Sequence, residues 1–177
     1  MPRTDNPEPV QVRPTVEADL AGIVAIQAHE VRTGVAHFGT EVPTLAEVET
    51  DWINTRERYG WFSAIEGGQV AGFAKGGPWK VRGAYRWAAQ VGIYVRPESQ
   101  GRGIGRALYE ALFPSLRQRG IRTVLAGITL PNDASVALHE TMGMTHAGTF
   151  HRIGYKQGLW LDTGYWELHW DDDKPPA

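Results

Sequence analysis

The stretch that decides the fold is residues 93–108, which read Ile93-Tyr94-Val95-Arg96-Pro97-Glu98-Ser99-Gln100-Gly101-Arg102-Gly103-Ile104-Gly105-Arg106-Ala107-Leu108. A strand-like apolar run leads into three closely spaced glycines, and a helical stripe that includes Ile104 and Leu108 follows. Glycine lets the main chain approach a ligand closely, and the first turn of a helix presents unpaired N–H groups and a positive dipole end. The stretch therefore predicts a strand, a tight loop and a helix whose N-terminus binds an anion such as a diphosphate.

Two common phosphate-binding patterns do not fit this stretch. The P-loop needs Gly-Lys-Ser/Thr, whereas Gly105 is followed by Arg106 and Ala107. The dinucleotide fingerprint G-x-G-x-x-G fails because its third glycine would fall on Arg106 or Leu108, and no βαβ unit precedes it. From these residues alone, an ordinary glycine-rich turn remains the alternative.

Composition indicates one globular domain in a chain of 177 residues, of which 42% are hydrophobic and 21% charged. A net charge of −2 without a long basic run argues against a nucleic-acid partner. The absence of cysteine excludes disulfides and thiolate chemistry, and the histidines show no metal-binding spacing, so no metal is expected. No apolar run nears the roughly 20 residues of a membrane helix, so we expect no membrane partner. The polar N-terminus is unlike a signal peptide, which makes the cytoplasm the expected location.

Apolar periodicity and turn residues give an element order of β-α-α-β-β-β-α-β-α-β-β, which predicts an α/β domain with a mixed sheet and helices on both faces. We expect a flexible arm at residues 1–9, the domain at 10–170 and a flexible tail at 171–177. The expected strands are Val10–Arg13, Trp61–Ile65, Gln69–Lys75, Arg86–Val95, Thr123–Ile128, Thr145–Ile153 and Thr163–Trp170, with Glu66-Gly67-Gly68 as a hairpin turn. The expected helices are Asp19–Arg32, Thr44–Tyr59 with a Thr44/Glu47 capping box, Gly103–Arg119, and a short helix capped by Asn132 or Asp133 that ends near Gly143. Pro114 should kink the third helix or end it early.

Two motifs resemble those of the GNAT acetyltransferase superfamily. Gln100 to Gly105 is similar to its Q/R-x-x-G-x-G/A motif, and the segment from Asn132 to Gly143 is similar to N-x-x-S-x-x-L-[YH]-E-x-x-G. The resemblance extends from about Val12 to Trp170 and implies a single-domain GNAT fold, a mostly antiparallel mixed sheet and acetyl-CoA as co-substrate. It implies coenzyme contacts from Ile93, Tyr94, Val95, Gln100, Gly101, Arg102, Gly103, Ile104, Gly105, Arg106, Asn132 and Ser135.

Further stretches are similar to the phosphinothricin and methionine sulfoximine acetyltransferases within that superfamily. They are Phe38-Gly39-Thr40-Glu41, Arg58-Tyr59, Gly77 to Arg82 with Tyr85, Leu130 to Asp133, and Gly154-Tyr155-Lys156 with Trp160 and Asp162. The resemblance implies a small-molecule acceptor, the α-amine of an amino-acid analogue, and a homodimer. It implies substrate contacts from Phe38, Lys80, Arg82, Tyr85, Thr129 and Thr163. A guanidinium and an ammonium suit an acidic head group, although from the residues alone Lys80 and Arg82 are better explained as solvated loop charges.

Catalysis requires a group that takes the proton of the attacking ammonium. The resemblance implies that His139 assists and that a glutamate acts as base, but Gln90 occupies the glutamate's position. A carboxamide cannot act as a base near neutral pH, although it can orient a water or bind the amine. Three explanations remain open: Glu41 supplies the carboxylate, His139 acts as the base through a water, or the chain has drifted to another substrate or to weak activity. We favour His139 with Glu41 as helper, against the alternative of a helix histidine satisfied by packing.

The sequence thus predicts an acetyl-CoA-dependent N-acetyltransferase that transfers acetyl directly, through a tetrahedral intermediate, to an amino-acid analogue such as phosphinothricin or methionine sulfoximine. Two alternatives are an acetyltransferase for a different amine and a weakly active acyl-CoA-binding module, the second because of Gln90.

Overall fold

The computed structural model describes residues 9–170 of the chain. The tail predicted at 171–177 and, apart from Pro9, the arm predicted at 1–9 lie outside the described residues. Seven strands and four α-helices make up the described part. The strands are β1 (Gln11–Pro14), β2 (Trp61–Glu66), β3 (Gln69–Pro78), β4 (Ala88–Val95), β5 (Thr123–Leu130), β6 (Thr145–Lys156) and β7 (Leu159–His169). The helices are α1 (Leu20–Thr33), α2 (Leu45–Tyr59), α3 (Ile104–Gln118) and α4 (Asp133–Thr141).

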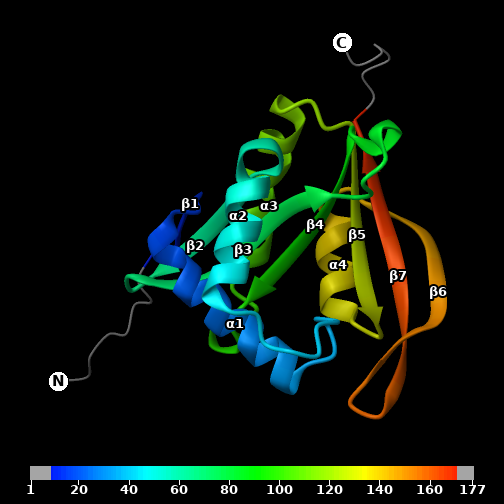
Figure 1. The fold of residues 1–177 in the computed structure, drawn as a ribbon, viewed down its shortest axis with the longest axis horizontal. Coiled ribbons are helices and arrows are strands. Elements are labelled where there is room, and N and C mark those ends of the chain that lie inside the picture. The colour runs from blue at the N-terminus through cyan, green and yellow to red at the C-terminus, as the bar shows by residue number, and fades with distance from the viewer. Residues whose placement is uncertain (1–8, 171–177) are drawn as a thin grey trace.

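The seven strands form one sheet in the order β1-β2-β3-β4-β5-β7-β6 (Figure 1). The β4–β5 pair is parallel, and every other neighbouring pair is antiparallel. This confirms the predicted mixed, mostly antiparallel sheet. The parallel pair at the middle of the sheet is the feature that positions the site described below.

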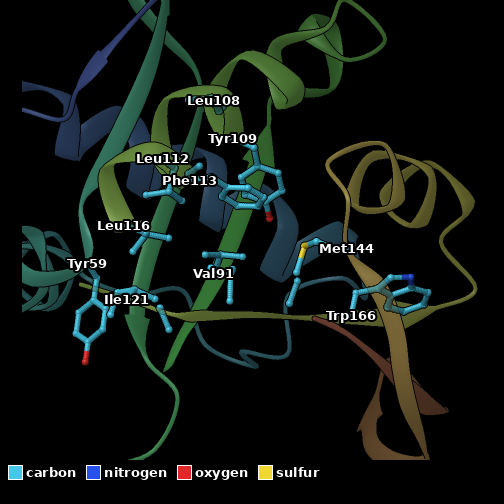
Figure 2. Packing of buried hydrophobic residues seen from close by; sticks show 14 of the residues in the cluster. Tyr59, Val91, Leu108, Tyr109, Leu112, Phe113, Leu116, Ile121, Met144 and Trp166 are labelled. Atoms are coloured by element: carbon cyan, nitrogen blue, oxygen red, sulfur yellow. The ribbon is translucent and has the colours of Figure 1, made fainter. Parts of the chain in front are cut away.

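Two apolar clusters show that helices cover both faces of the sheet. One cluster joins α1 and α2 to the sheet and includes Leu20, Val48 and Phe73. The other joins α3 to the opposite face, where Leu108, Leu112 and Leu116 gather with Val91 of β4 (Figure 2). α4 packs against this second cluster through its partly buried apolar side chains.

Local hydrogen bonds explain where two of the helices begin. Thr44 Oγ1 accepts a bond from Glu47 N–H at 3.2 Å, and the Glu47 carboxylate accepts one from Thr44 N–H at 2.8 Å. This confirms the predicted capping box of α2. For α4, the cap is Asn132 and not Asp133, because Asn132 Oδ1 accepts a bond from Ser135 N–H at 3.1 Å.

Of the two effects predicted for Pro114, a kink or an early end of the helix, the early end does not occur. α3 continues through Pro114 to Gln118, and the proline itself is exposed. Leu112, Phe113 and Leu116, on either side of it, are all buried. The tertiary packing of this stripe outweighs the local loss of one helical hydrogen bond.

The last two strands are longer than the sequence predicts, since β6 extends to Lys156 and β7 begins at Leu159. A two-residue turn, Gln157-Gly158, joins them with positive φ at both positions. The pairing register also shifts between Phe150 and Gly154, which leaves a bulge in β6. The bulge interrupts the two-residue alternation on which a strand prediction depends.

None of the helices within residues 9–170 combines the length and the apolar character that crossing a lipid bilayer requires.

Candidate active site

The two central strands separate before they end. β4 and β5 pair over only four positions, from Ala88 with Thr123 to Val91 with Ala126. Beyond that point both strands continue unpaired to one another, and their diverging segments line a cavity of about 510 Å³. A gap at the carboxyl ends of parallel strands is a common place for a ligand.

The glycine-rich loop forms one end of this cavity. Gly101 and Gly103 line it with φ of 71° and 79°, values that L side chains rarely adopt. A Cβ at either position would meet nothing within 4 Å, so the main chain there is open to a ligand. α3 begins at this loop, and no described side chain caps it, in contrast to α2 and α4. The free N–H groups of the first turn are therefore available to an anion.

Most of the residues predicted to contact a coenzyme line this cavity together. They are Ile93, Tyr94, Val95, Gln100, Gly101, Gly103, Ile104, Gly105, Arg106, Asn132 and Ser135. Arg102 is the exception: it is not among the lining residues, and its guanidinium pairs with the Glu66 carboxylate at the end of β2. The Asn132 side chain is engaged as the cap of α4.

His139 also lines the cavity, although only 3% of it is exposed. Its Nδ1 lies 2.7 Å from the Ser135 carbonyl oxygen, and its Nε2 lies 2.9 Å from the hydroxyl of Tyr109. Burial lowers the pKa of His139 and raises that of Tyr109, so the imidazole is neutral and the phenol keeps its proton. Nδ1–H therefore donates to the carbonyl, and the Tyr109 hydroxyl donates to Nε2.

A second cavity, of about 300 Å³, opens beside the first. It is lined by Ala36, Phe38, Gln90, Tyr94, Gly127, Thr129, Ile153, Thr163 and Tyr165. Ala36, Tyr94, Gly127 and Thr129 line both cavities, so the two meet where the strands diverge. Burial raises the pKa of Tyr94 to about 12, which leaves its phenol protonated at this junction.

Four of the predicted substrate or catalytic residues lie in the second cavity, namely Phe38, Gln90, Thr129 and Thr163. Thr129 Oγ1 donates to the Ala36 carbonyl at 3.4 Å. Thr163 Oγ1 is buried and has no hydrogen-bond partner among residues 9–170. A buried hydroxyl without a partner beside a cavity suits a ligand that supplies one.

The other four predicted side chains lie away from both linings as the structure describes them. Lys80, Arg82 and Tyr85 are exposed in the loop that follows β3, and Glu41 is exposed before α2. The start of this loop contacts a residue of the second cavity, because the Trp79 ring packs edge-on against Tyr165, with ring centroids 5.4 Å apart. Glu41 is not among the residues that line either cavity, and its role as the missing carboxylate stays a prediction.

The sequence analysis missed Tyr109, Tyr165 and Ile153 as site residues. Tyr109 belongs to the buried side of α3 next to Leu108, so its helical position indicated core and gave no sign of its contact with His139. Ile153 lies in the β6 bulge, which no sequence pattern indicated. Among the described residues, no group of three or more His, Asp or Glu side chains is arranged to hold a metal ion.

Comparison with known proteins identifies this arrangement. The model of the acetyltransferase (GNAT) family matches residues 25–144, which include both divergent strand ends and the glycine-rich loop. The chain belongs to the GNAT family. The predicted resemblance to that family is thereby confirmed.

Relatives within the GNAT family include enzymes for amino-acid analogues. The phosphinothricin N-acetyltransferase of Streptomyces viridochromogenes is 41% identical over 168 residues, which cover 95% of this chain and 92% of that protein. The L-methionine sulfoximine/L-methionine sulfone acetyltransferase of Pseudomonas aeruginosa is 32% identical and covers 90% and 94%. The crystal structure of a phosphinothricin acetyltransferase from Sinorhizobium meliloti in complex with AcCoA superposes with a TM-score of 0.91 at 31% identity, covering 95% of this chain and 93% of that one.

Proposed function

We propose that this GNAT acetyltransferase transfers the acetyl group of acetyl-CoA directly to the α-amine of a small amino-acid analogue such as phosphinothricin or methionine sulfoximine. The observation that carries the proposal is the meeting of two cavities at the gap between β4 and β5, with four shared lining residues. A thioester held in the larger cavity and an amine held in the smaller one would face each other there. Holding two reactants in that geometry removes much of the entropic barrier to their reaction.

The larger cavity fits a coenzyme with a diphosphate. Its open glycines and the uncapped N-terminus of α3 offer main-chain N–H groups at one end, and Arg106 adds a positive charge. Along its length run the unpaired ends of β4 and β5, whose main chain can hydrogen-bond an extended amide arm. When bound, acetyl-CoA supplies an activated acetyl thioester.

We propose that Tyr109 and His139 act as a pair that moves a proton at the Tyr109 hydroxyl. The Tyr109 hydroxyl donates a hydrogen bond to Nε2 of a neutral His139. Tyr109 can therefore pass its proton to Nε2 while its phenol oxygen accepts a proton from the attacking ammonium. Both residues line the larger cavity, which we call the coenzyme cavity. Gln90 lines the smaller one, which we call the acceptor cavity. Gln90 would then orient the amine or a water through its carboxamide oxygen, and not act as the base.

The acceptor class follows from the relatives and from the chemistry of the smaller cavity. Its described lining contains no acidic or basic residue, so it does not favour a polycation. The predicted substrate-binding cations, Lys80 and Arg82, belong to the loop that contacts Tyr165 through Trp79. We propose that this loop brings them to the acceptor's acidic head group, where a guanidinium can bind a carboxylate or phosphinate with two hydrogen bonds.

We also propose that the enzyme is a homodimer that buries exposed apolar side chains of the β6–β7 hairpin. β6 is an edge strand of the sheet. Five large apolar side chains of the hairpin are more than half exposed: Phe150, Ile153, Tyr155, Leu159 and Trp160. Tyr155 and Trp160 are paired across the two strands, and their ring centroids lie 5.2 Å apart. Exposed apolar surface of this kind often marks an interface. Light scattering of the purified protein tests this, and a monomer at micromolar concentration would refute it.

A thiol-release assay with acetyl-CoA and a panel of amines tests the proposed reaction. Turnover of phosphinothricin or methionine sulfoximine is the expected result. Turnover of cationic amines alone would support the alternative acceptor class, and tight binding of acetyl-CoA without turnover would support the non-catalytic module. His139→Ala should lower turnover with little change in acetyl-CoA affinity, and a variant with full activity would exclude His139 from the mechanism.

A further inference from the structure

Glu66 contacts the glycine-rich loop but is not among the residues that line the coenzyme cavity. It is the last residue of β2, and its side chain is 14% exposed. One carboxylate oxygen pairs with the Arg102 guanidinium. The other accepts a hydrogen bond from Ser99 Oγ at 3.0 Å and lies 3.7 Å from Arg96. One carboxylate thus contacts three residues of the segment that joins β4 to α3.

These contacts bracket the residues that line the coenzyme cavity. Ser99, which is 1% exposed, precedes Gln100 and Gly101 in the lining, and Arg102 lies between Gly101 and Gly103. The hydrogen bonds from Arg102 and Ser99 hold the pKa of Glu66 below its usual range, so the carboxylate is ionised at neutral pH. The Arg102 side chain is therefore committed to the hairpin tip and turned away from the cavity.

The loop needs such an anchor because it contains two glycines with positive φ. Glycine loses more conformational freedom on ordering than other residues, and fixing one backbone costs about 1–2 kcal/mol. A loop already ordered before the ligand arrives avoids that cost at binding. We propose that Glu66 is a positioning residue that holds the diphosphate-binding loop in its binding-competent form. This inference rests on the proposed binding of acetyl-CoA.

Positioning and simple charge repulsion predict opposite changes in coenzyme affinity when the charge of Glu66 is removed. Glu66 is an anion near a site for a polyanionic ligand, so on charge alone Glu66→Gln should tighten coenzyme binding. If Glu66 orders the loop, Glu66→Gln should weaken binding, because it loses the ion pair with Arg102. Glu66→Asp keeps the charge but is one methylene too short to hold both Ser99 and Arg102. Charge alone predicts no effect for Glu66→Asp, whereas positioning predicts weaker binding.

Isothermal titration calorimetry with acetyl-CoA distinguishes the two effects. Both variants should raise the Kd for acetyl-CoA about tenfold, the scale of one lost charge-assisted hydrogen bond. The matched control is Glu98→Gln, which removes the same charge from the loop itself and, like Glu66→Gln, takes a carboxylate away from Arg96. Glu98 contacts Arg96 at 3.3 Å, but its side chain is 65% exposed, so its removal should leave the Kd unchanged or slightly lower.

A second comparison separates positioning from general loss of structure. S-Acetyl-pantetheine carries the thioester but no diphosphate, so kcat/KM with this donor should be the same in Glu66→Gln and the wild type. With acetyl-CoA, kcat/KM should fall about tenfold. Equal or tighter acetyl-CoA binding by both Glu66 variants would overturn the inference, as would an equal loss with both donors. Failure of the wild type to bind acetyl-CoA would instead refute the proposed function.

Discussion

The contact between Gly154 and Phe38 allows the acceptor cavity to be altered by one methyl group. An alanine Cβ at position 154 would lie 2.5 Å from Cε2 and 2.8 Å from Cζ of Phe38. Carbon atoms in contact prefer separations of about 3.5–4.0 Å, so the ring must move by about 1 Å. Phe38 is 43% exposed, so it can move outward into solvent and need not compress its neighbours. Because Phe38 lines the acceptor cavity, Gly154→Ala displaces one wall of that cavity.

The size of the effect follows from two opposing terms. Overpacking a site costs about 1–3 kcal/mol, and a ring that can yield to solvent places this site at the lower end. Replacing glycine by alanine stabilises a compatible backbone by about 0.4–1 kcal/mol. We therefore expect the free energy of unfolding to fall by about 0.5 kcal/mol in urea denaturation. Loss of about 1 kcal/mol of acceptor contact should raise the KM for phosphinothricin about fivefold, without changing the Kd for acetyl-CoA.

Gly148→Ala is the matched control, because it makes the same change in the same strand where a Cβ would meet nothing within 4 Å. It should stabilise the protein slightly and leave the KM unchanged. If Gly154→Ala and Gly148→Ala have the same acceptor KM, Phe38 is not a wall of the acceptor site. If Gly154→Ala is as stable as Gly148→Ala, the close contact between Phe38 and Gly154 does not exist in solution.

Three further predictions concern the proton-handling groups. Gln90→Glu should raise turnover at neutral pH, measured by thiol release, because it places a carboxylate in the acceptor cavity; an unchanged rate would show that no base is needed there. Tyr109→Phe should lower kcat about tenfold or more, because Nε2 of His139 loses its hydrogen-bond donor. The affinity for acetyl-CoA should not change, because the ring keeps its stacking on Phe113. A variant with the wild-type kcat would exclude the hydroxyl from proton transfer. Burial lowers the pKa of His139 and His37 below the ordinary 6.5. As the pH falls through 6.5, the unfolded chain therefore binds more protons than the folded protein does. The free energy of unfolding should therefore fall between pH 7 and pH 5, and His139→Gln should reduce that slope in urea titrations; an unaltered slope would place the titration elsewhere.

Sequence patterns predicted the strands, the helices and most of the residues that line the larger cavity, because each depends on local rules. The capping box at Thr44 and the glycines at 101 and 103 act within a few residues of themselves. Each of the two motifs that line the larger cavity is a continuous stretch of sequence. Once the fold is correct, the two stretches meet at the cavity.

The acceptor side was less predictable because it depends on long-range contacts. Phe38 reaches its position by packing on Gly154, more than a hundred residues later in the chain. Glu41 lies three residues from Phe38 but does not follow it into the cavity. Glu66 looked like the first residue of a hairpin turn, and only the folded structure places its carboxylate against Arg102.

The early end of the β4–β5 pairing has a consequence for the free enzyme. Past Val91, the amide groups of β4 that point toward β5 have no strand to pair with, so the sheet carries two internal edges in its centre. These segments line the larger cavity, so an extended ligand can hydrogen-bond to them. Deuterium should enter these amides quickly in the free enzyme and slowly once an extended ligand lies between the strands.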